Sequence, residues 1–220
     1  MKKVLIFFLL TFTVCLSLAA QKDANALKIL DAMSDKYRKM AAFRANFNYV
    51  LYNEETDTRD SQKGEIIVMG DKYKLVAGPL EKYNDGKTVW TYYNNYNEVN
   101  IENYVPGESE LSPSFIFSAY KKNFKYSIES ESTIEGRTAY IIRLVPEKQD
   151  QFPIQFQWLK VYIDKMDYTL WGWQTLDQTG NTYTVSISGF DPYPGAGDAI
   201  FQFDASKHPG VYVSDLRDSK

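Results

Sequence analysis

Hydrophobic residues recur at steps of three and four positions over residues 23–42. This spacing places them along one side of an amphipathic helix, with lysine and aspartate residues on the other side. The pattern predicts an N-terminal helix that packs its apolar side on the rest of the fold. The residues of this apolar side are Ala26, Ile29, Met33, Tyr37 and Met40.

After Phe43 the hydrophobic period changes to 2, which is the period of a half-buried strand. Asp85-Gly86 lies between two such segments and is a strong signal for a hairpin turn, whereas residues 53–61 form a polar segment that predicts a loop. Strands are predicted at residues 47–51, 64–68, 73–75, 80–83, 88–93 and 98–101, and later at 124–130, 138–145, 155–163, 169–177, 182–188 and 200–203.

These strands follow one another without helical crossovers, which favours antiparallel pairing. A single sheet of about 11 strands must curl in order to bury one of its faces. We therefore predict a mainly β (α+β) fold, in which one curved antiparallel sheet forms an open, incomplete barrel covered by the N-terminal helix and a short central helix. The chain has no internal repeat and no long Pro/Gly linker, so residues 21–220 are predicted to form one domain.

The central helix is predicted within residues 111–122, between the two runs of strands. Ser112 suits the N-cap, Pro113 suits the first helical position, and Lys121 and Lys122 suit the negative end of the helix dipole. Apolar residues cover most of its circumference, so the helix either plugs the open end of the sheet or forms a lid that swings away from an apolar cavity. These residues are Phe115, Ile116, Phe117, Ala119 and Tyr120.

The first twenty residues have the organisation of a secretory signal peptide. Lys2 and Lys3 precede an apolar run over residues 4–18, after which small residues lead into a polar sequence. The run is shorter than the ~20 residues that a membrane-spanning helix needs. Cleavage is expected near Ala19 or Ala20, and the exported domain is expected in the periplasm.

The composition excludes several classes of protein. The net charge is −3, and removal of Lys2 and Lys3 changes it to −5, whereas a nucleic-acid-binding protein needs a basic surface. The one cysteine, Cys15 in the signal peptide, and the one histidine, His208, leave little for a metal site, a nucleophile–base pair or a disulfide framework. Phosphate-, dinucleotide- and calcium-binding motifs are absent. The sequence therefore predicts no enzyme activity, no catalytic or metal-binding residue, no cofactor and no nucleic-acid partner.

Aromatic residues make up 15% of the chain, and the four tryptophans fall on predicted strands. Trp171 and Trp173 are expected to share one face of their strand, and Trp158 lies on the strand before it. Such residues pack a core, stack on sugar rings or line a pocket for lipid. The apolar central helix favours the lipid pocket.

Several motifs occur in an order that is typical of one family. Residues 85–92 read Asp-Gly-Lys-Thr-Val-Trp-Thr-Tyr, and residues 70–75 read Gly-Asp-Lys-Tyr-Lys-Leu. Near the end of the chain, Phe-Gln-Phe at 201–203 precedes Pro-Gly-Val-Tyr-Val at 209–213. With the leading and central helices, this set resembles the periplasmic outer-membrane lipoprotein carrier proteins (LolA-like), whose hairpin and C-terminal motifs are similar. The resemblance spans nearly all of residues 21–220.

The resemblance implies a monomer with an open barrel closed by helices and a hydrophobic interior. It also implies receipt of acylated lipoproteins from an inner-membrane ABC transporter complex and delivery to an outer-membrane receptor, although the existence of a dedicated receptor stays open. The family commonly has an Arg-Pro pair before the Gly-Lys of the second motif, and its arginine bonds to the lid. Met69 and Gly70 occupy those places here, so this latch is absent or moved.

We expect a lipid-binding cavity lined mainly by aromatic and aliphatic side chains, which offer apolar area without needing hydrogen-bond partners. Strand phase decides this assignment, because a slip of one residue exchanges the two faces of a strand. The expected lining residues are Phe47, Tyr49, Leu51, Tyr73, Leu75, Trp90, Phe115, Ile116 and Ala119, and the expected lid residues are Ile29, Met33, Tyr37, Met40, Phe117 and Tyr120.

The sequence thus predicts a periplasmic carrier, or chaperone, that holds the acyl chains of lipoproteins and ferries them from the inner to the outer membrane. Two alternatives stay open. The same scaffold could serve as a periplasmic lipid- or ligand-binding sensor that does not transfer its ligand. The tryptophan and tyrosine residues of the strands could instead form a glycan-binding β module.

Overall fold

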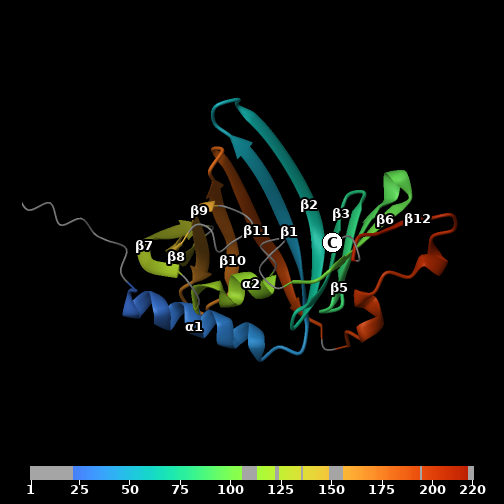
Figure 1. The fold of residues 1–220 in the computed structure, drawn as a ribbon. Helices are drawn as coiled ribbons and strands as arrows, with labels where there is room; N and C mark the ends of the chain where they lie inside the picture. Colours follow the sequence, from blue (N-terminus) through green and yellow to red (C-terminus); the bar gives the residue numbers. More distant parts are fainter. Residues whose placement is uncertain are drawn as a thin grey trace, which may run out of the picture.

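The computed structural model describes residues 22–105, 113–121, 124–134, 136–148, 156–193 and 195–217. The predicted signal peptide with its cleavage site lies outside these residues, as do the N-cap Ser112, Lys122 and the loop at 106–111. The described residues form one curved sheet of twelve strands that wraps partly around α1 (Ala24–Arg38) and α2 (Pro113–Ser118) (Figure 1). The predicted mainly β fold is confirmed, with twelve strands where about 11 were expected.

Two antiparallel meanders, β1–β6 and β7–β11, build most of the sheet, and the pairing of β1 with β11 joins them. The last strand, β12, is added in parallel to β6. The strand order is β12-β6-β5-β4-β3-β2-β1-β11-β10-β9-β8-β7, so β12 and β7 are the edges and the barrel is open. The strands are β1 (Phe43–Asn53), β2 (Thr58–Met69), β3 (Lys72–Ala77), β4 (Leu80–Asn84), β5 (Thr88–Tyr93), β6 (Glu98–Asn103), β7 (Phe124–Ile134), β8 (Arg137–Pro146), β9 (Phe156–Asp164), β10 (Leu170–Asp177), β11 (Asn181–Pro192) and β12 (Tyr212–Asp215).

The hairpin of β1 and β2 is longer than the sequence pattern predicted. Residues 58–61 were expected in a loop, but Thr58 pairs with Asn53 and Ser61 pairs with Val50. These polar residues belong to the end of the hairpin that projects beyond the helices (Figure 1). Because this end has no hydrophobic layer to face, its strand lacks the alternation by which a half-buried strand is detected.

Helix α1 begins where predicted and ends four residues earlier than predicted. The carboxylate of Asp23 accepts hydrogen bonds from the backbone N–H groups of Asn25 and Ala26, which is an N-cap. At the other end, the backbone carbonyl of Ala42 accepts a hydrogen bond from Tyr193, and Phe43 already pairs within the sheet. The backbone groups of Ala42 and Phe43 thus bond to other segments and not within a helix. The helix therefore ends before the apolar periodicity ends.

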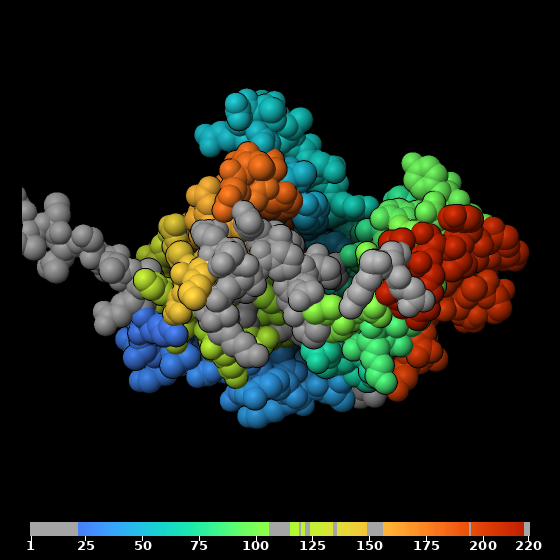
Figure 2. Space-filling view, in the orientation of Figure 1, coloured from blue at the N-terminus to red at the C-terminus, as the bar shows by residue number. Residues whose placement is uncertain are grey.

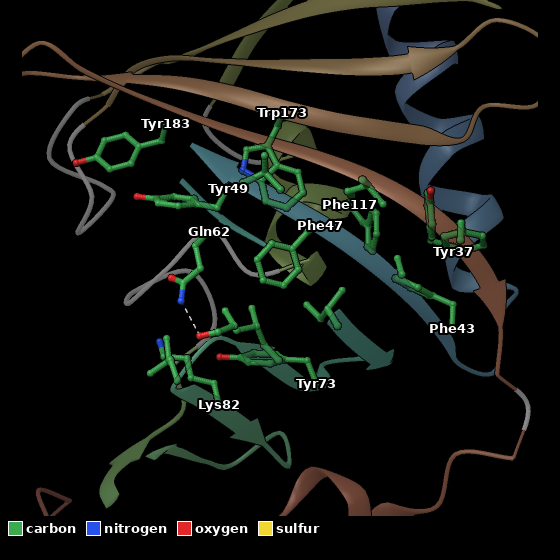
Figure 3. Close-up of a pocket in the computed structure, with 18 of the residues that line it drawn as sticks. Tyr37, Phe43, Phe47, Tyr49, Gln62, Tyr73, Lys82, Phe117, Trp173 and Tyr183 are labelled. Atoms are coloured by element: carbon green, nitrogen blue, oxygen red, sulfur yellow. Dashed lines mark hydrogen bonds between the residues drawn. The ribbon is translucent and has the colours of Figure 1, made fainter. Parts of the chain in front are cut away.

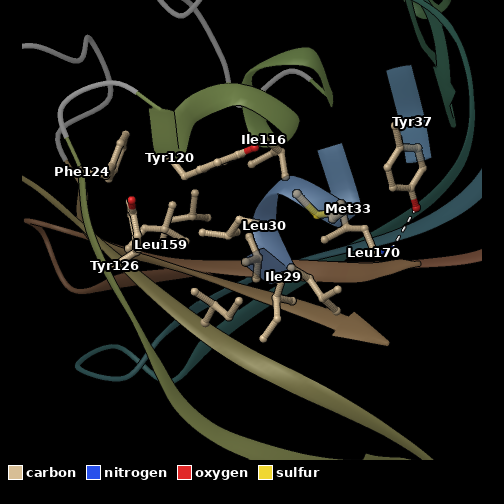
Figure 4. Close-up of a cluster of buried hydrophobic side chains, with 14 of the residues drawn as sticks. Ile29, Leu30, Met33, Tyr37, Ile116, Tyr120, Phe124, Tyr126, Leu159 and Leu170 are labelled. Atoms are coloured by element: carbon tan, nitrogen blue, oxygen red, sulfur yellow. Dashed lines mark hydrogen bonds between the residues drawn. The ribbon is translucent and has the colours of Figure 1, made fainter. Parts of the chain in front are cut away.

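The core lies between α1, α2 and the half of the sheet formed by β7–β10 (Figure 4). Leu30 and Met33 of α1 are fully buried there, and α2 with the 3-10 turn η2 (Ala119–Lys121) adds Ile116 and Tyr120. Leu159 on β9 is fully buried beneath the helices. Helix α1 is thus held by its packing on the sheet, as its amphipathic pattern predicted.

The C-terminal segment packs on the outer face of β3–β6 and does not form the strand predicted at 200–203. Residues Asp198–Phe201 form the 3-10 turn η4, and Phe201 is fully buried. Phe203 packs on Tyr83 and Tyr92, and the ring of His208 stacks on Phe203 with 4.6 Å between ring centroids. The single histidine therefore packs among aromatic rings. In Figure 2 this segment (red) lies against the strands of that end (green).

A β-bulge at Gly172 corrects the expectation that Trp171 and Trp173 share a face. The register shifts between Leu170 and Gly172, which breaks the alternation of β10. Trp171 lies on the outer face of the sheet, where the guanidinium carbon of Arg137 is 5.6 Å from its ring centroid. Trp173 lies on the inner face and lines a cavity.

Substituting Gly172→Ala is expected to destabilise the fold by more than about 1 kcal/mol. The φ angle of Gly172 is +151°, and a Cβ atom there would lie 2.0 Å from the backbone oxygen of Val185. Urea unfolding followed by tryptophan fluorescence measures the change. The matched control is Gly195→Ala, because a Cβ atom at Gly195 meets nothing within 4 Å. Equal stability of the two variants would contradict this account of the bulge.

Candidate functional site

A cavity of about 540 Å³ lies between the concave face of the sheet and the ends of α1 and α2 (Figure 3). This volume falls in the ~300–1,000 Å³ range of pockets that enclose a small-molecule ligand. Most of its wall is aromatic or aliphatic. The lining residues are Tyr37, Phe43, Ala45, Phe47, Tyr49, Gln62, Ile66, Tyr73, Leu75, Ala77, Leu80, Lys82, Phe117, Trp173, Thr175, Tyr183, Val185, Ile187 and Phe190.

Cross-strand pairing places these side chains together. On β1, every second residue from Phe43 to Tyr49 lines the cavity, as alternation along a strand requires. Tyr49 is paired with Val185 on β11, which is paired in turn with Trp173 on β10. Directly paired residues lie on the same face of a sheet, so these three strands form one continuous wall.

Gly64 makes room for one of the largest wall residues. It is paired with Phe47 on β1, and a Cβ atom at Gly64 would lie 2.5 Å from the Cζ atom of the Phe47 ring. The missing side chain on β2 therefore leaves the space that the Phe47 ring occupies. This explains why the glycine stands inside a strand, where it otherwise weakens the structure.

The end of the cavity beneath the helices is aromatic. The rings of Tyr37 from α1 and Phe117 from α2 stack with 4.2 Å between centroids, and Phe43 and Phe190 pack around them. The hydroxyl oxygen of Tyr37 accepts a hydrogen bond of 2.9 Å from the backbone N–H of Leu170. Burial raises the pKa of Tyr37 to about 12, so this tyrosine stays neutral. The helices thus close this end with an uncharged surface.

Polar groups also line the cavity. The side-chain amide of Gln62 donates a hydrogen bond of 2.6 Å to the carbonyl of Ala77, and the hydroxyl of Tyr183 donates one of 2.9 Å to Asp177. Burial raises the pKa of Tyr49, and burial together with the bond to Asp177 raises that of Tyr183. Burial lowers the pKa of Lys82. Apart from Lys82, these polar groups are neutral at neutral pH.

The two helices differ in how they are attached. Helix α1 is bonded at both ends, by the N–H of Asp23 to the carbonyl of Tyr126 on β7 and by the ammonium of Lys36 to the carbonyl of Asp167 in the turn between β9 and β10. The segment of α2 and η2 is bonded to α1, because the hydroxyl of Tyr120 donates a hydrogen bond of 2.6 Å to Asp31.

The structure places part of the expected residues on the cavity wall. Of the expected lining residues, Phe47, Tyr49, Tyr73 and Leu75 lie there together. Two expected lid residues, Tyr37 and Phe117, also line the cavity. The other lid residues pack in or against the core under the helices, where Ile29, Met33 and Tyr120 are buried and Met40 is partly buried just after the end of α1.

The remaining expected lining residues lie elsewhere, and these assignments are corrected. Trp90 is paired with Tyr83, whose ring packs against the C-terminal segment, so it lies on the outer face of the sheet. Leu51 follows the inward residues of β1 but lies beyond the wall, toward the projecting end of the hairpin. Ile116 and Phe115 point into the core instead of the cavity. The side chain of Ala119 lies outside the described part of the structure.

The cavity residues of β11 and the polar lining were not predicted from the sequence. Tyr183, Val185 and Ile187 alternate with polar residues, a pattern that was recognised as a strand but not connected to the cavity. The link is the β1–β11 pairing, which joins residues more than one hundred positions apart. Lys82 follows the inward Leu80 by two positions. Because alternate residues of a strand share a face, this spacing could have indicated that Lys82 also faces the cavity.

The described residues contain no group of three or more His, Cys, Asp or Glu side chains that could hold a metal ion. None of the helices in the described ranges is long and apolar enough to cross a membrane.

Comparisons with known proteins identify a family model and solved structures that resemble this chain. Residues 38–204 match the model described as outer membrane lipoprotein carrier protein LolA. No curated protein matches the sequence. An uncharacterized conserved protein from Thermus thermophilus has a similar fold, with a TM-score of 0.56 at 13% identity over 87% of this chain and 99% of that one.

Two further solved structures are more distant. A LolA superfamily protein from Nitrosomonas europaea matches with a TM-score of 0.46 at 9% identity, over 81% of this chain and 98% of that one. The lipoprotein LppX of Mycobacterium tuberculosis matches with a TM-score of 0.48 at 10% identity, over 78% of this chain and 97% of that one.

Proposed function

The chain belongs to the LolA family of outer membrane lipoprotein carrier proteins, and on this premise we propose that it is a periplasmic carrier that binds the acyl chains of lipoproteins in its cavity. It receives these lipoproteins from an inner-membrane ABC transporter complex and ferries them to the outer membrane, where a receptor accepts them. The observation that carries the proposal is the apolar cavity of about 540 Å³ beneath the ends of two helices.

The physical need for such a carrier follows from the cost of exposing acyl chains to water. Each buried CH₂ group is worth about 0.8 kcal/mol, so a 16-carbon chain loses on the order of 12 kcal/mol on exposure. The aromatic wall around Phe47, Tyr49 and Trp173 provides an apolar surface that shields an acyl chain from water. A wall built from rings of several strands contacts a flexible chain without fitting one conformation of it closely, which favours release as well as binding.

Transfer between membranes is tested with the components that the proposal names. The protein is incubated with inner-membrane vesicles that contain the transporter and radiolabelled lipoproteins, in the presence of ATP. The expected result is release of lipoproteins into a soluble complex that contains this protein. Failure to release lipoproteins, with a LolA protein of the same bacterium as a positive control, would contradict the carrier role.

A binding protein that does not transfer its ligand is the second candidate, because the same cavity would serve it. It predicts an acyl ligand that copurifies and is identified by mass spectrometry, but no release of lipoproteins from vesicles. The two measurements together separate the candidates.

Met69 stands where the family commonly has the latch arginine, and the hydrogen bond from Tyr120 to Asp31 is the bond that joins the segment of α2 and η2 to α1 among the described contacts. Tyr120→Phe removes this bond and is expected to weaken the attachment of α2 to α1 by about 1–2 kcal/mol, because the acceptor is a carboxylate. Release of a fluorescent acyl probe should accelerate about fivefold to thirtyfold, measured by stopped-flow fluorescence. Tyr96→Phe is the matched control, because Tyr96 is 78% exposed. Equal release rates for both variants would show that the bond does not hold the lid.

A further inference from the structure

Neutral polar side chains of the cavity are gathered at the end away from the helices. Figure 3 shows Tyr49, Gln62 and Tyr183 toward one side, and Tyr37 of α1 toward the other. Lys82 lies at the same end as the first three, but it already has an interaction within the protein. This end of the cavity therefore offers a ligand neutral hydrogen-bonding groups.

Strand pairing brings the three neutral side chains together. Tyr49 on β1 is directly paired with Gln62 on β2, and side chains so paired have Cβ atoms about 4.5–5.5 Å apart. Tyr183 on β11 is paired with Leu51, two positions along β1 from Tyr49. The ring centroids of Tyr49 and Tyr183 are 6.3 Å apart. Tyr49 thus lies between the other two.

Tyr49 supplies a hydrogen-bond donor. Its hydroxyl makes no hydrogen bond with any of the described residues. Burial raises the pKa of Tyr49, and the carboxylate of Asp60 raises it further, so the hydroxyl keeps its proton at neutral pH. A donor in a mainly apolar wall forms a stronger hydrogen bond than the same donor does in water.

Gln62 supplies an acceptor. Its side-chain amide donates a hydrogen bond of 2.6 Å to the carbonyl of Ala77, and a carbonyl can only accept, so the bonded atom is the nitrogen. The Oε1 atom makes no hydrogen bond with the described residues and can accept one from a ligand. Tyr183 gives its hydroxyl proton to Asp177, so its oxygen is a second acceptor.

The chemistry of an acyl chain decides what such a site can recognise. An acyl chain ends in a carbonyl, which is an ester when it is attached to oxygen and an amide when it is attached to nitrogen. Both linkages are neutral, and both carbonyls accept hydrogen bonds. Only the amide also has an N–H that donates one. An amide can therefore bond to a donor and an acceptor at once, whereas an ester can use only the donor.

We propose that this cavity prefers amide-linked acyl chains to ester-linked ones, with Tyr49 donating to the carbonyl oxygen and Gln62 accepting from the amide N–H. The proposal rests on the proposed function in taking an acyl chain as the occupant, and it adds the linkage that the site selects. The tail extends along Phe47 toward the aromatic end under the helices.

The test compares two ligands that differ only in the linkage. Palmitoylethanolamide carries an amide, and ethylene glycol monopalmitate carries an ester in the same place. Affinities are measured by displacement of a fluorescent acyl probe from the processed protein. The wild type is expected to bind the amide about threefold to tenfold more tightly than the ester. A cavity without partners for the amide would give the opposite order, because an unpaired amide costs more to bury than an ester.

Three variants assign the preference to its residues. Gln62→Met is expected to lose about threefold to tenfold in affinity for the amide and to keep its affinity for the ester. Tyr49→Phe is expected to weaken both ligands by a similar factor, because both have the carbonyl. Tyr52→Phe is the matched control and should change neither affinity, since alternation places Tyr52 on the outer face of β1. Thermal unfolding verifies that each variant is folded.

The outcomes separate this inference from the proposed function. If the wild type binds the ester as tightly as the amide or more tightly, the inference is overturned while acyl binding stands. A folded Gln62→Met protein that keeps the full preference for the amide also overturns it. If the wild type binds neither ligand, acyl binding in this cavity fails and the inference fails with it.

Discussion

A lysine in place of Val185 is expected to lower the affinity for a neutral acyl ligand by at least about 100-fold. Val185 lies in the middle of the apolar wall, between its paired neighbours Tyr49 and Trp173. A bound acyl chain would strip water from the ammonium group, which costs several kcal/mol without a compensating partner. The ligand-free protein can hydrate the new charge through the mouth of the cavity, so the fold should survive. Monopalmitoylglycerol is the suitable probe, because an anionic head could pair with the new lysine.

The matched control is Ser186→Lys. Ser186 is the next residue of β11 and is exposed on the other face of the sheet. Both variants add one positive charge to the same strand, so a difference between them reports on the face and not on the charge. Probe displacement gives the affinities, and thermal unfolding gives the stability. Unchanged affinity in a folded Val185→Lys protein would place the acyl site elsewhere in the molecule.

Truncation of Leu159 to alanine is expected to reduce the free energy of unfolding by about 3–5 kcal/mol. Leu159 is fully buried among the core side chains under α1 and α2, and its removal leaves a void that the surrounding side chains cannot fill. Leu75→Ala removes the same atoms from the cavity wall, where the side chain already borders open space. Leu75→Ala should lower the free energy of unfolding by about 1–2 kcal/mol, because the variant loses mainly the free energy of transferring the deleted methyl groups out of water.

Urea unfolding measures both variants, and the difference between them is the informative quantity. A cost for Leu75→Ala as large as that for Leu159→Ala would mean that the cavity wall is packed like a core. Such a result would remove the room that an acyl ligand requires. The expected difference therefore tests the existence of the cavity by a route that does not depend on any ligand.

Local sequence signals predicted the elements well where a hydrophobic layer faces them. The start of the N-terminal helix, the hairpin turn at Asp85 and the family motifs agree with the structure and with the family match. The predictions are wrong where tertiary contacts, and not the local hydrophobic pattern, decide the conformation. Phe201 and Phe203 alternate as in a strand, yet they lie in and after a 3-10 turn because they fill the outer face of a neighbouring sheet region.

The candidate site was predictable only in part, because strand phase cannot be read from aromatic residues alone. Phe47 and Tyr49 follow a clear alternation, and both lie on the cavity wall. Trp90 lies among residues that are apolar on both sides of β5, so its sequence neighbours do not distinguish the inner from the outer face. The pairing with Tyr83 and the covering C-terminal segment decide that it faces outward.

The sequence by itself determined the class of fold, the family and the supply of aromatic side chains, because periodicity, turns and ordered motifs are properties of neighbouring residues. The tertiary structure alone decided where the hollow lies and what its two ends are made of. That decision depends on the pairing of β1 with β11, on the bulge at Gly172 and on the position of Lys82 among apolar residues. Each of these is a contact between distant segments, and no local pattern encodes which distant segment a strand will meet.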